Sequence, residues 1–338
     1  MVGRPRGRVG AALLIAVAVV AVLQALVQGS GVSVAYARPA MTSLESLHAS
    51  VSISPAPAAR FWQSYDAPDT RPAVVPVGRS PVAVPILMYH YIRVPPDPQA
   101  DRLGFGLSVS PDAFRAQMNW LADHAYHTIT IGDLRRYLQG EQPLPDRSVA
   151  LTFDDGYLDL YSEAFPVLVQ HHFTATAYIV SGFVGAPGRN VSQGQVVEMD
   201  RYGIEIASHT FSHPDLTSLT GERLGTELSA SKAALESLVG HPVVDFCYPA
   251  GRFDSAVVDA VRSAGYQSAT TTVDGVMHSF DDRFTWSRVR VAGGESLDDF
   301  ARGLSRYEAG VRPITPPPPI QIPRVFPLLL TGVLNELQ

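Results

Sequence analysis

The chain has 338 residues, a formal net charge of −6 and a pI near 5.9, which argues against a nucleic-acid-binding protein because such proteins normally carry a basic surface. Cys247 is the only cysteine, so an intramolecular disulfide and a zinc site with two or more cysteine ligands are both excluded. A bound metal would therefore depend mainly on histidine and carboxylate ligands.

Residues 1–37 have the features of a targeting segment. Three arginines precede an apolar stretch over residues 11–27, and residues 35–37 read Ala-Tyr-Ala, a pattern that signal peptidase cleaves. The stretch is long for a signal peptide and nearly long enough to span a bilayer, so a cleaved signal peptide and a retained membrane anchor both stay open. Either outcome places the domain that follows in the extracellular space or the cell envelope, because the arginines stay inside.

Two segments flank the expected domain. Residues 38–82 are rich in Pro, Ala and Ser and lack sustained apolar periodicity, which predicts a linker. Residues 311–338 form a Pro-rich C-terminal tail, in which the stiff run from Pro316 to Pro319 marks the end of the domain. The domain itself is expected to span residues 83–310, and we expect a monomer, although no feature of the sequence sets the oligomeric state.

Strand and helix patterns alternate between residues 83 and 310. Strands are predicted over residues 84–91, 148–153, 174–180, 204–208, 243–247, 267–272 and 287–291. Helices are predicted to begin at Ser110-Pro111 and to cover residues 157–171, 220–239 and 254–264. About six to eight strand signals with crossover helices predict an α/β fold, a closed or nearly closed parallel (β/α) barrel.

Two pairs of polar residues directly follow predicted strands. Asp154 and Asp155 follow one strand, and His209 and His213 follow another. Because active sites of β/α barrels form where the strands end, these side chains and the loop after Cys247 are expected to converge. A single histidine would as readily be structural. Together, two imidazoles and one carboxylate suit a divalent cation, and the second carboxylate can take a proton from water, so the pattern predicts a metal-dependent hydrolase.

These segments match the motifs of a known family. Residues 152–156 read TFDDG and residues 209–213 read HTFSH, which are the first and second motifs of the polysaccharide deacetylases, the NodB-homology or carbohydrate esterase family 4 enzymes. The chain resembles this family over residues 83–300. The segments ILMYHY at 86–91 and FCYPAG at 246–251 resemble the branch that deacetylates the biofilm polysaccharide poly-N-acetylglucosamine. The resemblance implies a distorted, usually seven-stranded parallel (β/α) barrel and a divalent metal.

The resemblance also implies a role for each matched residue. The metal ligands would be Asp155, His209 and His213, with Zn²⁺ as the expected ion and Co²⁺, Ni²⁺ or Fe²⁺ as alternatives. Asp154 would be the general base that takes a proton from the attacking water. The backbone N–H of Ala250 would stabilise the tetrahedral oxyanion.

Neighbouring residues are predicted to form the substrate pocket. Tyr248, Pro249 and Gly251 belong to the third motif, and the last two would shape its turn. Trp286 is predicted to line the apolar pocket that receives the acetyl methyl group, with core packing as the alternative.

Two parts of the family pattern are missing from the chain. The arginine that usually pairs with the catalytic base is replaced by Cys247. We expect Arg288 to supply this cation to Asp154, with an ordinary surface ion pair as the alternative. The histidine that usually acts as general acid is not evident, and His90, at the end of the first strand, is favoured over His278 as the acid or as a supporting residue.

The expected function is that of an exported N-deacetylase, a hydrolase of carbon–nitrogen bonds that acts on N-acetylhexosamine residues of a cell-surface or extracellular polysaccharide. An O-acetyl esterase is an alternative, because it uses the same site and needs less protonation of its leaving group. A carbohydrate-binding homologue with weakened catalysis is a second alternative, against which the retained Asp154 argues. A structural role for the Pro-rich ends is least favoured. The sequence does not specify the polymer.

Overall fold

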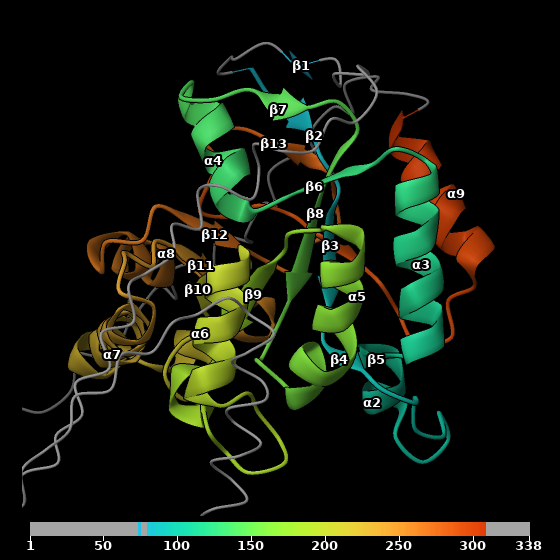
Figure 1. Ribbon diagram of the computed structural model, residues 1–338. Helices are drawn as coiled ribbons and strands as arrows, with labels where there is room; N and C mark the ends of the chain where they lie inside the picture. The colour runs from blue at the N-terminus through green and yellow to red at the C-terminus, as the bar shows by residue number, and fades with distance from the viewer. Residues whose placement is uncertain (1–73, 76–79, 309–338) are drawn as a thin grey trace, which may run out of the picture. The chain divides into compact units, whose positions relative to one another are not determined.

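The structure is a computed structural model that describes residues 74–75 and 80–308 (Figure 1). The predicted targeting segment 1–37 and tail 311–338 lie outside the described residues, as does most of the predicted linker 38–82. Within the described part of the chain, no helix combines the length and the apolar character that crossing a membrane requires.

A parallel sheet of eight strands forms the centre of the domain (Figure 1). Its order is β12-β11-β10-β9-β8-β3-β14, and β6 pairs with β8 beside this path. The strands are β3 Ile86–Tyr89, β6 His127–Ile129, β8 Ser148–Phe153, β9 Thr176–Ile179, β10 Glu205–Ser208, β11 Asp245–Cys247, β12 Ser268–Thr270 and β14 Val289–Arg290. All its pairings are parallel, so their carboxyl ends share one edge of the sheet.

The two ends of this sheet approach each other through the segment around β14. β14 pairs with β3, and just before it Trp286 forms a parallel bridge with Thr270 of β12. The sheet therefore curls into a distorted barrel, and the fold class predicted from the sequence is confirmed. The distortion includes β6, which pairs with the first half of β8, whereas β9 pairs with its second half.

Helices pack around this barrel (Figure 1). They are α2 Arg102–Leu107, α3 Pro111–Asp123, α4 Ile131–Gln139, α5 Phe165–His171, α6 Gln193–Tyr202, α7 Gly221–Val239, α8 Ser255–Ser263 and α9 Leu297–Glu308. Short antiparallel pairs join β1 Val74–Val75 to β7 Leu144–Pro145 and β2 Val82–Ala83 to β13 Met277–His278, and a parallel pair joins β4 Tyr91–Ile92 to β5 Ser108–Val109. Strands β1 and β2 therefore begin pairing within the range predicted as linker.

Local sequence signals account for several helix ends. The Ser110 hydroxyl accepts a hydrogen bond from the backbone of α3, with Pro111 at the first position, and Gly240 ends α7 with φ of 78°. The helix predicted over residues 157–171 is instead divided into a π-helical segment, Leu160–Ala164, and α5. Pro166, which lacks a backbone N–H, lies in the first turn of α5, where the π-helical pattern changes to the α-helical one.

The barrel separates two apolar layers. Inside it, Ile86, Tyr178 and Trp286 form a buried cluster with Leu134 and Leu138 of α4, so α4 closes the amino-terminal end of the barrel. Outside it, larger clusters fill the space between the strands and the surrounding helices. The strands are therefore covered on both faces, as is usual for parallel sheets, and the carboxyl-terminal mouth is the end that α4 does not cover.

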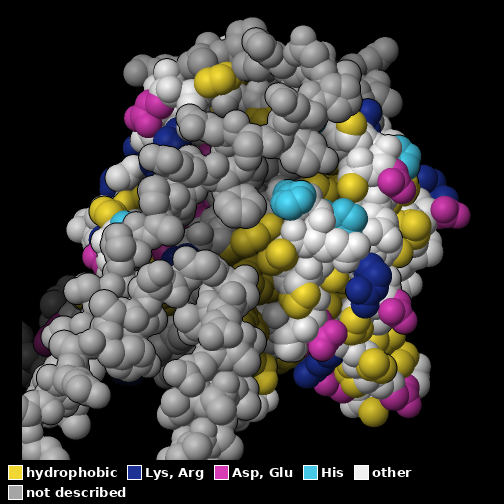
Figure 2. All heavy atoms as spheres, viewed as in Figure 1, with side chains coloured by type: hydrophobic (Ala, Val, Ile, Leu, Met, Phe, Trp, Pro, Cys, Tyr) yellow, Lys and Arg dark blue, Asp and Glu magenta, His cyan; other side chains and the backbone are white. Residues whose placement is uncertain are grey.

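Some large hydrophobic side chains remain exposed. Val94 is 80% exposed and Leu103 is 73% exposed. Figure 2 shows hydrophobic side chains at its lower right, over α2 and the loop that precedes it. In Figure 1, α2 and α7 lie on opposite sides of the domain. The apolar surface at Leu103 is therefore separate from any surface near α7.

Candidate active site

The predicted site residues meet at the carboxyl-terminal mouth of the barrel. Asp154 and Asp155 directly follow β8, and His209 directly follows β10. The loops that carry them adopt uncommon backbone geometry, because Asp155 has φ of 71°, His213 has 60° and Ala250 has 53°. Non-glycine residues rarely adopt positive φ, and such residues concentrate at functional sites.

Three side chains at this mouth form a set of metal donors. The Oδ1 atom of Asp155 lies 3.4 Å from Nε2 of His209 and 3.2 Å from Nε2 of His213. All three donor atoms lie within 4.8 Å of one another. A tetrahedral centre with bonds of 2.0–2.1 Å separates its ligand atoms by about 3.3 Å. The spacing of the donors and their chemistry therefore both fit a small divalent cation such as Zn²⁺.

The protein orients both histidines. Nδ1 of His209 lies 2.7 Å from the carbonyl oxygen of Cys247 and donates a hydrogen bond to it. This contact leaves the lone pair of Nε2 facing Asp155, which is the arrangement that metal-binding histidines require. The backbone N–H of His213 donates to Oγ1 of Thr210 at 2.9 Å, and this bond tightens the turn that carries the second imidazole.

Two supporting residues were not predicted from the sequence. The Glu227 carboxylate, on α7, accepts hydrogen bonds from the backbone N–H groups of Phe211 and Ser212 at 3.0 and 2.8 Å. The side-chain amide of Asn190 donates to the carbonyl oxygens of Asp155 and Gly156 at 3.1 and 3.2 Å. Neither residue belongs to a motif or has a local sequence signal. Both hold the backbone of the loops that present the metal donors.

Asp154 forms a buried ion pair with Arg288. Nη1 and Nη2 of Arg288 lie 2.7 and 2.8 Å from the two carboxylate oxygens, and the side chains are only 0% and 2% exposed. The guanidinium group also donates to the carbonyl oxygen of Thr271, to Oγ1 of Thr152 and to the Cys247 thiol. The alternative of a surface ion pair is therefore contradicted. The cation that the third motif lacks reaches Asp154 from the residue that directly precedes β14.

Both carboxylates are charged at neutral pH. Burial alone would raise the pKa of Asp154, but the positive charge and hydrogen bonds of Arg288 outweigh it and lower this pKa to about 2. Burial would also raise the pKa of Asp155, but hydrogen bonds with His209 and His213 lower it below its ordinary value. The site therefore presents two negative charges, of which only one is neutralised by an arginine.

The two candidate acid residues lie at opposite ends of the barrel. Nε2 of His90 is 3.7 Å from Oδ2 of Asp154, at the mouth. Burial lowers the pKa of His90, so this side chain is neutral at neutral pH. His278 is fully buried near the start of β3, where its Nε2 donates to the carbonyl oxygen of Val84, and burial lowers its pKa to about 4. Only His90 is close to the site.

The third-motif loop exposes a backbone donor. Ala250 is exposed, and within residues 80–308 its backbone N–H has no acceptor. Gly251 has φ of 69°, and a Cβ atom at this position would lie 2.0 Å from Oγ1 of Thr272. A glycine is therefore required at 251 for the turn that leaves the Ala250 N–H free. Pro249 is buried and starts this turn.

Two residues predicted for the substrate pocket belong to the core instead. Tyr248 is 0% exposed, and its hydroxyl donates to the carbonyl oxygen of Phe284 in the layer outside the barrel. Trp286 is 1% exposed, and its indole N–H donates to the carbonyl oxygen of Ser279. Neither side chain is open to the mouth, so the pocket predicted from them is wrong and the alternative of core packing holds for Trp286.

Comparisons with known proteins point to one family. A family model described as polysaccharide deacetylase matches residues 141–269. A protein of Bacillus subtilis (strain 168) named as the polysaccharide deacetylase YxkH is 32% identical over 220 residues, which cover 65% of this chain and 75% of that protein. The poly-β-1,6-N-acetyl-D-glucosamine N-deacetylase of Escherichia coli (strain K12) is 26% identical over 240 residues, covering 59% of this chain and 36% of that enzyme.

A solved structure gives the same result. The Streptococcus pyogenes deacetylase PplD, in complex with acetate, matches with a TM-score of 0.61 and 28% identity, covering 67% of this chain and 99% of that chain. The region matched by the family model contains the donor set and the third-motif loop, although Arg288 lies outside it. The resemblance predicted from the motifs is thus confirmed, and the chain belongs to the polysaccharide deacetylase family of hydrolases that act on carbon–nitrogen bonds.

Proposed function

We propose that the protein is an exported, metal-dependent N-deacetylase that removes acetyl groups from N-acetylhexosamine residues of a cell-surface or extracellular polysaccharide. One observation carries this proposal: the donors of Asp155, His209 and His213 meet beside a separate carboxylate, Asp154, that Arg288 holds in its ionised form. Binding a metal requires only the donors. Hydrolysis also requires a base, and the second, oriented carboxylate can supply it.

Each residue at the mouth has a part in this chemistry. Asp155, His209 and His213 would hold the cation, which supplies a Lewis acid for the acetamide carbonyl and lowers the pKa of an attacking water. Asp154 accepts the proton of that water. A carboxylate whose pKa is about 2 is a weak base, so it serves this role only for a strongly acidified water.

Two further groups complete the proposed reaction. The free backbone N–H of Ala250 is available to donate a hydrogen bond to the oxyanion that forms at the acetyl carbon. His90, 3.7 Å from Asp154, can accept the proton from this carboxylate and return it to the leaving amine. This route uses one histidine near the base in place of a separate acid.

The relatives support the choice of substrate. The Escherichia coli relative is named for deacetylation of poly-β-1,6-N-acetyl-D-glucosamine, and relatives from Staphylococcus epidermidis and Staphylococcus aureus carry the same name. We therefore propose a polymer of N-acetylhexosamine as the substrate of this chain. Its extracellular or cell-envelope location rests on the targeting features of residues 1–37, which also allow a membrane tether.

An O-acetyl esterase is a second candidate because of where His90 lies. This histidine contacts Asp154, on the side of the base, and a leaving alcohol needs less protonation than a leaving amine. Both reactions would use the same donors and the same base.

Acetate release from a panel of N- and O-acetylated glycans tests both candidates. We expect the purified protein to release acetate from β-1,6-linked N-acetylglucosamine oligosaccharides. A chelator should abolish this release, and Asp154→Asn should reduce it by about 10²–10⁴-fold. Release from O-acetylated glycans alone would favour the esterase. Activity that persists with a chelator would contradict the mechanism for both.

A further inference from the structure

Two exposed phenylalanines lie beside the loop that carries the metal donors. Phe211 is 43% exposed and Phe183 is 40% exposed. Phe211 is two residues from His209 and two from His213, so its Cα lies within about 8 Å of theirs. Exposed apolar patches that are rimmed by polar residues often mark ligand-binding grooves.

The backbone around these rings is held in place. The N–H of Gly182 donates to the carbonyl oxygen of Phe211 at 2.8 Å, and the N–H of Ser181 donates to that of Thr210 at 3.1 Å. The N–H of Phe211 in turn donates to the Glu227 carboxylate at 3.0 Å. The exposure of Phe211 is therefore a property of a well-bonded loop.

Gly182 packs directly against the backbone and ring of Phe211. A Cβ atom at Gly182 would lie 2.5 Å from the Phe211 carbonyl oxygen and 3.2 and 3.3 Å from two of its ring carbons. Any side chain at this position would push the ring or the loop away. The ring therefore packs against the backbone of Gly182, and the Phe211 residue still remains 43% exposed.

The other aromatic pair near the site differs in this respect. The rings of Tyr91 and Tyr157 stack with centroids 3.8 Å apart, and the Arg93 guanidinium lies 3.5 Å from the Tyr91 centroid. The two stacked faces, and the face of Tyr91 under Arg93, are therefore already covered. Among the residues that the structure describes, neither Phe183 nor Phe211 stacks on another aromatic ring.

We propose that Phe211 and Phe183 form a stacking subsite for a pyranose ring of the polymer, next to the sugar whose acetyl group reaches the donors. This inference rests on the proposed function. The C–H face of a pyranose is apolar, so it is desolvated favourably against an open aromatic ring. A rigid ring loses little conformational freedom when it binds, which suits it to a repeating substrate.

The subsite predicts a loss that depends on substrate length. With the metal-loaded protein, we expect Phe211→Ala and Phe183→Ala each to raise KM for a β-1,6-linked N-acetylglucosamine pentasaccharide about tenfold. Hydrolysis of 4-nitrophenyl acetate, which is too small to reach the subsite, should change little. Leu103→Ala, which removes a more exposed side chain on α2, is the matched control and should leave both activities unchanged.

Binding separates this inference from the proposed function. In an Asp154→Asn background, calorimetric titration with the pentasaccharide should show about tenfold weaker binding for each Phe variant. If the wild type released no acetate while this loss of affinity remained, the proposed function would fail and the subsite would stand. Unchanged affinity in both Phe variants would overturn the subsite. A parallel loss of 4-nitrophenyl acetate hydrolysis and metal content would also overturn it, because Phe211 would then only position the donors.

Discussion

The barrel contains a buried Arg–Asp pair at each end, and only one of them lies in the candidate active site. At the mouth, Arg288 binds both carboxylate oxygens of Asp154 at 2.7 and 2.8 Å. At the closed end, Arg135 of α4 binds both carboxylate oxygens of Asp245 at 2.9 and 3.3 Å. Both aspartates are at most 2% exposed. The ion pairs are alike, so the ion pair itself does not identify a site.

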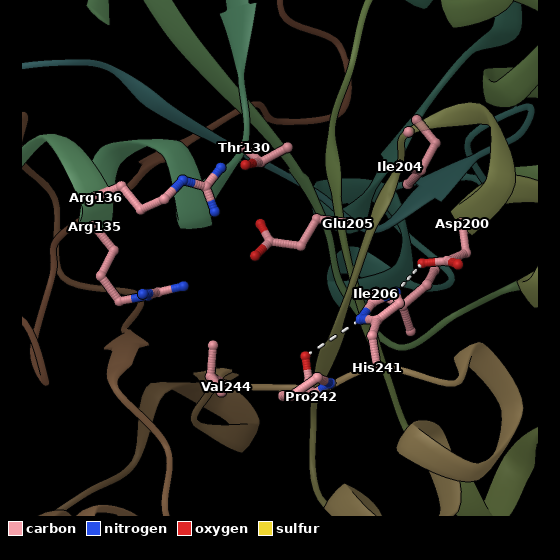
Figure 3. A pocket seen from close by; sticks show the side chains of 11 residues that line it. Thr130, Arg135, Arg136, Asp200, Ile204, Glu205, Ile206, His241, Pro242 and Val244 are labelled. Carbon is pink, nitrogen blue, oxygen red and sulfur yellow. Dashed lines mark hydrogen bonds and ion pairs between the residues drawn. The ribbon is translucent and has the colours of Figure 1, made fainter. Parts of the chain in front are cut away.

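The surroundings of the two pairs differ. Around Arg135 and Asp245, the remaining polar atoms bond to one another, since Gln267 accepts from Arg135 and Ser268 donates to Asp245. A cavity of about 290 Å³ adjoins this network, and Arg135 and Glu205 point into it (Figure 3). The network at the closed end therefore satisfies its own groups and ties α4 to the strand starts.

At the mouth, in contrast, several groups are left available. The donors of Asp155, His209 and His213 face one another, and Ala250 exposes an unused N–H. Positive φ values occur at four non-glycine residues of these loops, whereas Ala125, Arg147 and His172, the other three in the described chain, lie in turns away from the site. Backbone strain and unused donors thus distinguish the reactive end from the structural end.

Matched substitutions of the two aspartates give the largest expected contrast. Each substitution removes the carboxylate that a buried arginine binds, so Asp154→Asn and Asp245→Asn should each lower the free energy of unfolding by about 3–5 kcal/mol. Only Asp154→Asn should also reduce kcat for acetate release, by about 10²–10⁴-fold, since it removes the base. Urea unfolding and steady-state kinetics measure the two effects. A folded Asp245→Asn protein with an equally large loss of kcat would remove the distinction.

The Glu227 anchor should have an intermediate effect. Glu227→Ala removes the acceptor for two backbone N–H groups of the donor loop, and loss of such support typically weakens metal binding about 10–100-fold. Competition with a chelator of known affinity measures this change directly. Glu222→Ala, at an exposed position on the same helix, is the control. Equal metal affinity in both variants would argue that the loop holds its shape without Glu227.

The sequence could predict the site where the relevant residues are neighbours in the chain. The Asp154-Asp155 pair and the His209/His213 pair each form a short motif after a strand, so their convergence follows from a parallel barrel. Arg288 could be predicted only as a hypothesis, because it lies 134 residues from Asp154 and its pairing depends on how the sheet closes.

Other features could not be predicted from the sequence, for physical reasons. Both faces of a parallel strand are buried, so the pattern of apolar residues does not distinguish the inside of the barrel from the outside. For this reason the sequence places Tyr248 in the pocket, whereas the side chain packs outside the barrel. Glu227 lies on a half-buried helix position with no distinctive pattern. The closure of the amino-terminal end by α4 likewise depends on tertiary packing, which no local motif specifies.

The smallest predicted effect concerns Glu205 at the closed end, and it is seen only in how the free energy of unfolding changes with pH. Burial, together with the negative charge of Asp245, raises the pKa of Glu205 well above its ordinary value. The folded state therefore keeps a proton that the unfolded state loses above about pH 4.3. This contribution to stability is complete below that pH and is lost as the pH rises through the folded pKa.

Glu205→Gln replaces this carboxyl group with a permanently neutral one. The free energy of unfolding of the variant should then fall less steeply than that of the wild type as the pH rises above about 4.3. Urea unfolding of both proteins across this range, with a chelator present so that metal release does not contribute, measures the difference. Glu198→Gln, at an exposed position of α6, should behave as the wild type does. Parallel curves for wild type and Glu205→Gln would contradict this prediction and show that Glu205 is ionised in the folded protein. Arg135 would then neutralise two carboxylates at the closed end, whereas Arg288 neutralises one at the mouth.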